Sequence, residues 1–289
     1  MNEHRFFPRF TSGIAPSPQV ASSILISERE DLETAGIIQS RLFPSRLPQL
    51  AGLDYYGECR PAGRLGGDFF DFVLLPENIL AVSIGDVSGH GISAAIMMSG
   101  MQAFLRGLTA HRGGPVTGVV EELNRAVCQT SPDNFYATLL YAHVDPVRRQ
   151  MHYVSAGHEP ALLVRSRTGE IQRLDSTGTV LGLTARTTFE QRVLSFEPDD
   201  VFVAFTDGVT EAADSEGREL GQKGVIRILE DCARARASDL VCRIVEEVDR
   251  FTTYAAPLDD RTAVAIRFTG RASQATFVED TVELAFAAA

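Results

Sequence analysis

Apolar residues recur at helical spacing in several stretches of the chain. After Ser27, for example, Leu32, Ala35 and Ile38 fall on one side of a helix, and Glu30 follows Ser27 at the spacing of a capping box. Similar stripes occur further along, and Gly or Pro residues follow where they end. The predicted helices cover residues 27–43, 92–108, 116–128, 223–234 and 238–251.

Between these helices, short apolar blocks occur in pairs, with turn-forming residues inside a pair at 76–78, 145–146 and 168–169. Hairpins in sets, broken by pairs of helices, differ from the strand–helix alternation of a parallel sheet. We therefore expect an α+β fold with antiparallel sheets and helices packed outside them. The predicted strands cover residues 53–60, 69–75, 79–84, 137–144, 151–155, 160–165, 171–174, 190–196, 201–205 and 262–268.

The same pattern divides the chain into four parts. Residues 1–26 hold Pro8, Pro16, Pro18, Gly13 and several serines, and they predict a flexible leader. Residues 27–47 predict an N-terminal helix, which either packs on the domain as an ordinary element or serves as a switch or dimerisation helix. Residues 48–268 form the main domain, and residues 269–289 predict a C-terminal tail.

Composition narrows the function classes. The formal net charge of −11 argues against nucleic acid as a partner, because such binding requires Lys and Arg to neutralise phosphates. No apolar run approaches the ~20 residues of a membrane-spanning helix, and the first ten residues lack the apolar stretch of a signal peptide. The four cysteines form no CxxC pair, which predicts free thiols in a reducing compartment. We expect a cytoplasmic protein without a membrane contact.

Acidic residues recur where predicted strands meet loops. These positions are Asp68, Asp86, Asp207 and Asp259, and three of them adjoin glycine. Asp is also common in turns for its local hydrogen bonds, so any one of these positions has an ordinary structural explanation. Four together predict a cation site, because gathered carboxylates repel one another without one.

The donor set indicates which cation. Ligands that are all oxygen select hard ions, namely magnesium, manganese or calcium. A pair of such ions can bind a phosphate and lower the pKa of a bridging water, which then attacks phosphorus without a protein nucleophile. The residues alone predict this hard-cation site and leave the reaction open.

Five ordered motifs add a family resemblance. Together they resemble the SpoIIE/RsbU-type branch of the metal-dependent type-2C (PPM) protein phosphatases, over residues 48–268. Each motif is weak alone, and the set in this order and spacing is specific. The motifs are Gly66-Gly67-Asp68-Phe69-Phe70-Asp71, Gly85-Asp86-Val87-Ser88-Gly89-His90-Gly91, Ala156-Gly157-His158, Thr206-Asp207-Gly208-Val209-Thr210-Glu211 and Asp259-Asp260-Arg261-Thr262.

The resemblance implies a sandwich of two antiparallel β-sheets flanked by helices and a centre holding two divalent cations, Mn²⁺ or Mg²⁺. Asp86 would match the aspartate that bridges both ions, and the Val87 carbonyl would match a ligand of one. Asp207 and Asp259 would match the carboxylates of the second ion. Asp68 would match an acidic residue beside the metal-bound waters, or a ligand of a further ion.

Some assignments within the motifs depend on position. We choose Asp259 over Asp260 because it holds the first place of the Asp-Asp-x-Thr motif. His90 either acts as a general acid towards the leaving oxygen or braces its Gly-flanked turn, and we favour the brace. His158 is expected to orient a loop. Arg64, just before the first motif, is a candidate phosphate clamp.

By resemblance, the reaction is hydrolysis of phosphoserine or phosphothreonine on a protein. The substrate would be a phosphorylated anti-anti-sigma factor of the STAS class in a partner-switching or stress-response pathway. A regulatory partner or a second copy would engage the N-terminal helix. Two alternatives stay open: a non-catalytic binding module of a sigma-factor switch, and a diguanylate cyclase, because residues 66–70 look like the GGDEF signature apart from its Glu.

Overall fold

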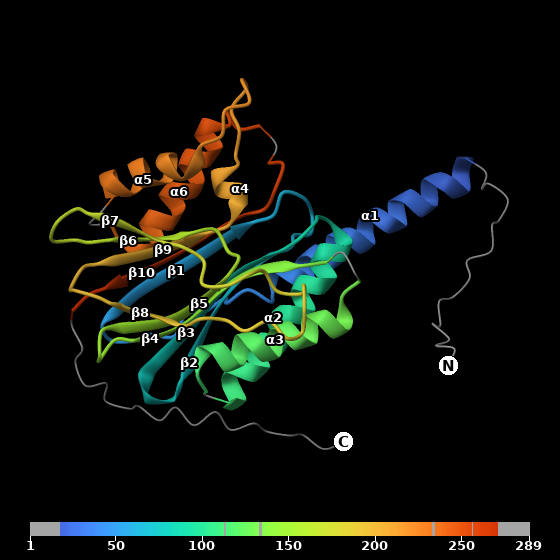
Figure 1. The fold of residues 1–289 in the computed structure, drawn as a ribbon. Coiled ribbons are helices and arrows are strands. Elements are labelled where there is room, and N and C mark those ends of the chain that lie inside the picture. The colour runs from blue at the N-terminus through green and yellow to red at the C-terminus, as the bar shows by residue number, and fades with distance from the viewer. Residues whose placement is uncertain (1–17, 113, 133–134, 233–234, 256, 271–289) are drawn as a thin grey trace, which may run out of the picture.

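Two five-stranded antiparallel sheets lie face to face, with helices on both outer surfaces (Figure 1). The structure is a computed structural model that describes residues 18–112, 114–132, 135–232, 235–255 and 257–270. This architecture confirms the predicted α+β sandwich. All ten predicted strands form, with ends within a few residues of the expected ones.

The first sheet has the strand order β1-β10-β9-β6-β7 and the second the order β2-β3-β4-β5-β8. Every pairing between strands of these two sheets is antiparallel. The strands are β1 (Leu53–Arg60), β2 (Asp68–Leu75), β3 (Ile79–Val87), β4 (Ala137–Asp145), β5 (Gln150–Ala156), β6 (Ala161–Val164), β7 (Ile171–Leu174), β8 (Arg192–Ser195), β9 (Val201–Phe205) and β10 (Arg261–Phe268).

A pair of helices covers each outer face. The helices α2 (Ile92–Arg112) and α3 (Val116–Thr130) pack on the second sheet. The helices α5 (Gly221–Cys232) and α6 (Ala237–Phe251) pack on the first sheet, next to the short α4 (Asp207–Thr210). Figure 1 shows the two pairs on opposite sides of the sandwich.

The core has three layers, which follow from the period-two alternation of each strand. One layer lies between the sheets and includes Phe70, Phe72 and Phe202. The second joins the second sheet to α2 and α3, and the third joins the first sheet to α5 and α6. Because both faces of each sheet are covered, the central strands are buried on both sides.

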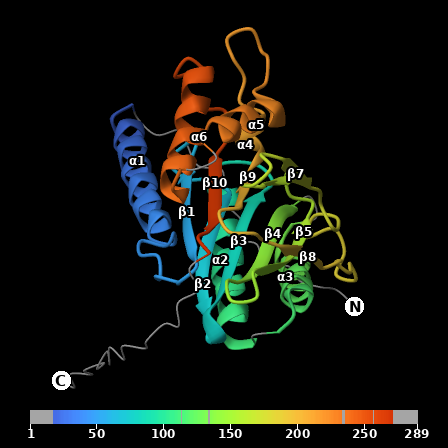
Figure 2. The same cartoon turned by 90° about the vertical axis from the view of Figure 1, so that its left-hand side faces the viewer.

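The N-terminal helix α1 spans Pro18–Ser40 and lies outside the sandwich in both views (Figures 1 and 2). It begins before Ser27, so the assignment of residues 18–26 to a leader was wrong. Pro suits the first turn of a helix, where its missing N–H needs no partner. The Ser27–Glu30 spacing therefore lies inside the helix and does not mark its start. Residues 1–17 and 271–289 lie outside the described residues.

Two features of residues 190–210 differ from the predicted elements. The predicted strands 190–196 and 201–205 are consecutive in the chain, and only four residues separate them. In the structure β8 pairs with β5 of the second sheet, while β9 lies in the first sheet between β10 and β6. The segment 196–200 therefore crosses between sheets. The single turn α4 was also not predicted, because four residues carry no periodicity.

The strand order brings the acidic motifs to one end of the sandwich. In the second sheet, Asp68 at the start of β2 is opposite Asp86 near the end of β3, and Asp86 is opposite Thr138 at the start of β4. In the first sheet, β9 ends and β10 begins at the corresponding end, where Phe205 pairs with Ala263. Loops from both sheets can therefore meet there.

Candidate metal centre

Asp68 connects the two sheets at the end of the sandwich where the acidic motifs meet, here called the centre. Its carboxylate is buried and accepts hydrogen bonds from the Thr262 hydroxyl at 2.6 Å and the Thr206 hydroxyl at 2.7 Å. The Thr206 hydroxyl in turn accepts the backbone N–H of Thr262 at 3.1 Å. Burial, followed by the charge of Asp86, raises the pKa of Asp68 well above its usual value. These donors hold Asp68 in one orientation beside Asp86.

Thr206 and Thr262 are functional-site residues that we did not assign from the sequence. Both belong to motifs that we recognised, next to Asp207 and close to Asp259 respectively. Their role could have been inferred from that position, because a buried carboxylate requires donors. The register that brings two threonines of one sheet to an aspartate of the other was not readable from the chain.

Asp86, Asp207 and Asp259 interact electrostatically although they lie in three separate motifs. Burial, followed by the charges of Asp207 and Asp259, raises the pKa of Asp86 to about 7. Burial, and then the charge of Asp259, raises the pKa of Asp207. The fold thus brings together the carboxylates that the sequence predicted would converge.

The structure separates the roles of Asp259 and Asp260. Asp260 is buried, and its carboxylate accepts backbone N–H groups of Ala62 at 2.7 Å and Gly67 at 2.6 Å. It also accepts the N–H of Asp68 at 3.3 Å. Asp259 is exposed, and its carboxylate accepts a local hydrogen bond from the N–H of Asp260 at 2.8 Å. Asp260 therefore anchors the 62–68 loop, and Asp259 retains oxygens for a ligand.

Three glycines allow the loops to approach this closely. A Cβ on Gly208 would lie 1.9 Å from the Asp260 carbonyl oxygen, and one on Gly66 would lie 2.5 Å from the Asp260 carboxylate. A Cβ on Gly67 would lie 2.9 Å from the Val87 carbonyl oxygen, the predicted backbone ligand. A side chain at these glycines would thus clash, with backbone at Gly67 and Gly208 and with the Asp260 carboxylate at Gly66.

Further acidic side chains extend the negative field. Burial raises the pKa of Glu159. The charge of Arg173 opposes this shift, and the charge of Asp207 adds to it. Burial, followed by the charge of Asp207, raises the pKa of Glu211. Neither was singled out from the sequence, although Glu211 ends the fourth motif and Glu159 follows the third.

The donor set fits hard divalent cations, since every candidate ligand is an oxygen. Among the described residues, no group of three or more Asp, Glu, His or Cys side chains is placed so as to hold one metal ion. The carboxylates nevertheless lie close enough to raise one another's pKa. A wide, open acidic centre of this kind suits ions that keep several waters and use few carboxylates, as Mg²⁺ does.

The candidate phosphate clamp is engaged elsewhere. The Arg64 guanidinium pairs with Glu33 of α1 at 2.7 Å, and both side chains are close to half-exposed. His90 is exposed on the turn between β3 and α2 and lines a pocket together with Arg64. The structure therefore places both residues near the centre, with Arg64 directed to the N-terminal helix.

His158 lies behind the centre. It is buried, and its Nδ1 lies 2.8 Å from the Thr138 hydroxyl, with which it shares a hydrogen bond. Thr138 is the β4 partner of Asp86. Burial lowers the pKa of His158 to about 4, so the imidazole is neutral at pH 7. It fixes the end of β5 against β4.

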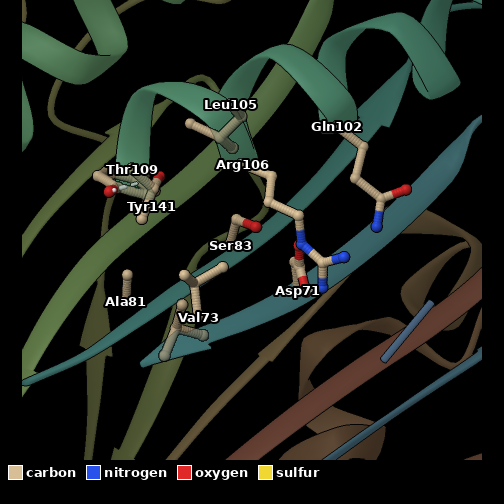
Figure 3. Close-up of a pocket in the computed structure, with 10 residues that line it drawn as sticks. Asp71, Val73, Ala81, Ser83, Gln102, Leu105, Arg106, Thr109 and Tyr141 are labelled. Carbon is tan, nitrogen blue, oxygen red and sulfur yellow. Dashed lines mark hydrogen bonds and ion pairs between the residues drawn. The ribbon is translucent and has the colours of Figure 1, made fainter. Parts of the chain in front are cut away.

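The two aspartates of the first motif face opposite sides of β2, because side chains alternate along a strand. Asp68 faces the centre, whereas Asp71 faces α2 and is buried. There the Arg106 guanidinium pairs with the Asp71 carboxylate, with Nε 2.8 Å from Oδ2 and Nη2 2.9 Å from Oδ1 (Figure 3). Asp71 thus belongs to the attachment of α2.

Comparison with known proteins identifies the family. The profile of SpoIIE, Stage II sporulation protein E, matches residues 76–269. The chain belongs to the SpoIIE family. Asp86, Asp207 and Asp259 lie within the matched range. Among curated relatives, the phosphoserine phosphatase RsbU of Bacillus subtilis (strain 168) is 30% identical over 244 residues, covering 83% of this chain and 70% of RsbU.

Two further likenesses agree with this assignment. Protein IcfG of Synechocystis sp. is 27% identical over 264 residues, and the match covers 82% of this chain but 41% of IcfG. The SiaA-PP2C domain of Pseudomonas aeruginosa superposes with a TM-score of 0.76 at 20% identity, covering 86% of this chain and 99% of that domain. At this identity the latter shows the fold.

This SpoIIE/RsbU-type chain is a member of the metal-dependent type-2C phosphatases and has the enzyme class of the protein-serine/threonine phosphatases. The cyclase alternative is therefore wrong: residues 66–70 lead into β2 of a phosphatase sheet and only look like GGDEF. Within its described residues, the chain has no helix that is long and apolar enough to cross a membrane.

Proposed function

We propose that this SpoIIE-family chain hydrolyses phosphoserine or phosphothreonine on a phosphorylated STAS-type anti-anti-sigma factor in a partner-switching pathway. The observation that carries the proposal is the convergence of Asp86, Asp207 and Asp259, whose charges act on one another at one end of the sandwich. The name of its relative RsbU, a phosphoserine phosphatase, supports the choice of phosphoserine.

The centre would hold two divalent cations, Mn²⁺ or Mg²⁺. Asp86 would bridge them, the Val87 carbonyl would be a ligand of one, and Asp207 and Asp259 would complete the other. Asp68 would be a further acidic member beside them. When bound, such ions supply positive charge for the phosphate and lower the pKa of a coordinated water.

The residues of the chain prepare this site in three ways. Thr206 and Thr262 orient the Asp68 carboxylate through their hydroxyls. The Asp260 carboxylate holds the 62–68 loop by accepting hydrogen bonds from the loop's N–H groups, so Asp259 is not needed for that contact. His158 is neutral at pH 7 because burial lowers its pKa to about 4, so it positions β5 and does not donate the proton to the leaving serine oxygen.

We also propose that α1 is a switch or dimerisation helix. Its Gln39 is hydrogen-bonded to the backbone of Gly66, and the adjacent Gly67 donates its N–H to Asp260. Glu33 pairs with Arg64 of the same loop. A partner or second copy that moves α1 would therefore act on the loop that precedes Asp68.

The reaction can be tested with the purified chain, p-nitrophenyl phosphate and a panel of phosphorylated STAS-domain proteins. We expect hydrolysis with Mn²⁺ or Mg²⁺, loss of activity with a chelator, and dephosphorylation of at least one protein of the panel. If the metal-loaded protein left both substrate types untouched, the non-catalytic binding alternative would replace this function.

The role of α1 needs a separate measurement. Light scattering on the whole chain and on a chain that lacks residues 1–45 gives the mass of each. We expect the whole chain to be a dimer and the truncated chain a monomer. An unchanged oligomeric state on truncation would count against dimerisation through α1.

A further inference from the structure

The N-terminal part of α2 lacks the charged residues that a surface helix ordinarily carries. Residues 92–105 contain no Asp, Glu, Lys or Arg, although such residues make up 22% of the chain. Helices on protein surfaces normally place charged side chains opposite the buried stripe. Here Ile92 and Ile96 face solvent instead, with 56% and 66% of their surface exposed. Since they are four residues apart, they lie on one side of the helix.

A second segment brings another apolar side chain to the same end of the molecule. Leu258, 92% exposed, directly precedes the candidate ligand Asp259. It lines one open pocket of about 420 Å³ together with Ile92, next to the centre. The same pocket is also lined by Leu32, Leu65, His90, Asp260 and Arg64, whose guanidinium pairs with Glu33.

These positions are connected directly to the candidate centre. Gly91, at the end of the motif that holds Asp86, immediately precedes Ile92. A specific protein interface covers about 800 Å² on each partner. A protein that presents a phosphoserine to Asp86 and Asp259 must therefore also cover Ile92 and Leu258, which a small phosphate ester does not need to reach.

We propose that Ile92, Ile96 and Leu258 form a docking surface, here termed the apolar rim, for the folded phosphoprotein substrate. The inference rests on the proposed function and adds how its substrate is recognised. Its occupant is a phosphoprotein that carries an apolar patch beside the phosphorylated serine. Exposed apolar groups close to a functional site mark interaction surfaces.

Charge explains why this surface is apolar. The chain has a net charge of −11 and its centre is lined by carboxylates, so a phosphoprotein meets a repulsive field around the cations. Lys or Arg side chains at the rim would pair with those carboxylates and compete with the cations. Uncharged side chains add attraction through burial without altering the field at the centre.

Two neutral substitutions test the rim, Ile96→Ser and Leu258→Ser. Val147→Ser is the matched control, because Val147 is 69% exposed and lies past the end of β4 that is remote from Asp86. Each variant is assayed on p-nitrophenyl phosphate and on the phosphorylated STAS-domain protein that the wild type dephosphorylates fastest. For both rim variants, we expect kcat/KM on the protein to fall at least tenfold more than kcat/KM on the small ester. For the control, we expect any change in kcat/KM to be the same on both substrates.

Three outcomes would overturn the inference. Equal losses on both substrates would show that the rim acts on the centre and not on docking. If the chain hydrolysed the small ester but dephosphorylated no protein of the panel, the phosphatase chemistry would stand. The docking of a phosphoprotein would then be contradicted. A change from dimer to monomer in Ile96→Ser, measured by light scattering, would assign this face to contact between copies. Failure of the wild type on p-nitrophenyl phosphate would instead count against the proposed function.

Discussion

The side-chain amide of Gln39 is hydrogen-bonded in both directions to the backbone of Gly66. Its Nε2 donates to the Gly66 carbonyl at 2.8 Å, and its Oε1 accepts the Gly66 N–H at 3.0 Å. Gln39 is buried although its neighbours on α1, Ile37, Ile38 and Ser40, are exposed. This contact joins α1 to the loop that Asp260 holds beside the candidate metal centre.

Gln39→Ala should lower stability by about 1–3 kcal/mol, because it leaves a buried N–H and a buried carbonyl without partners. Since that loop leads to Asp68, we also expect more divalent cation to be needed for half-maximal activity. Urea unfolding and a metal titration of activity measure the two effects. Ser40→Ala, at the exposed neighbouring position, is the control, and equal effects of both variants would contradict a specific role for Gln39.

Gly208→Ala should prevent the centre from forming. Its Cβ would lie 1.9 Å from the Asp260 carbonyl oxygen, so either α4 or the 259–260 backbone must move. We expect loss of activity and a lowered melting temperature. Gly118→Ala is the matched control, since the nearest atom to its Cβ is 3.8 Å away and Ala favours the helix. A Gly208→Ala protein with full activity would show that the close approach is not required.

The strands and the outer helices could be predicted because their signals are local. Short apolar blocks separated by turn residues indicated the hairpins, and apolar stripes indicated α2, α3, α5 and α6. The pairing of β8 with β5 was not predictable, because a cross-over between sheets leaves no mark on nearby residues. The start of α1 was missed for another reason: Pro16, Pro18 and the nearby serines make this stretch resemble a leader by composition.

The candidate site was predicted at the level of its carboxylates and not of their support. Asp68, Asp86, Asp207 and Asp259 carry motif signals, and the structure brings the last three into electrostatic contact. The hydrogen bonds from Thr206 and Thr262 to Asp68 depend on how two sheets face each other. The ion pair between Arg64 and Glu33 depends on where α1 packs. Such long-range contacts have no local signature in one sequence.

The Asp71–Arg106 pair should be strongly coupled. Asp71 is buried while Arg106 is half-exposed, so Arg106→Leu leaves an unpaired carboxylate against α2 and should cost about 2–4 kcal/mol. Adding Asp71→Asn should recover part of that loss, which a double-mutant cycle by urea unfolding measures. Arg148→Leu, whose partner Asp145 keeps two backbone N–H donors, should cost under about 1 kcal/mol. Additive effects at Asp71 and Arg106 would contradict the coupling.

Stability should depend on pH through His143. Burial, with a smaller effect of His152, lowers the pKa of His143 to about 4, whereas the unfolded residue has an ordinary pKa near 6.5. The unfolded state therefore binds the extra proton between these values, so stability is full above about pH 6.5 and falls towards pH 4. His143→Gln should reduce the difference in unfolding free energy between pH 7 and pH 5. An unchanged difference would show that His143 is not a source of the acid sensitivity.

Asp86→Asn should abolish activity and stabilise the protein without added cations. Burial and the charges of Asp207 and Asp259 raise the pKa of Asp86 to about 7, so at pH 8 the folded state holds an ionised group that it disfavours. A neutral amide removes that repulsion and should add about 1–2 kcal/mol. Thermal unfolding with a chelator measures this, and Mn²⁺ should then raise the melting temperature of the wild type more than that of the variant.

Asp199→Asn makes the same chemical change at an exposed position and should alter neither activity nor the response to Mn²⁺. The two variants together separate metal binding from folding, because an inactive Asp86→Asn protein that is also unstable would indicate a structural defect. Full activity of Asp86→Asn would contradict the two-cation centre itself. We expect an inactive, more stable protein that responds weakly to Mn²⁺, because Asp86 serves to bind the cations although the neighbouring carboxylates repel it.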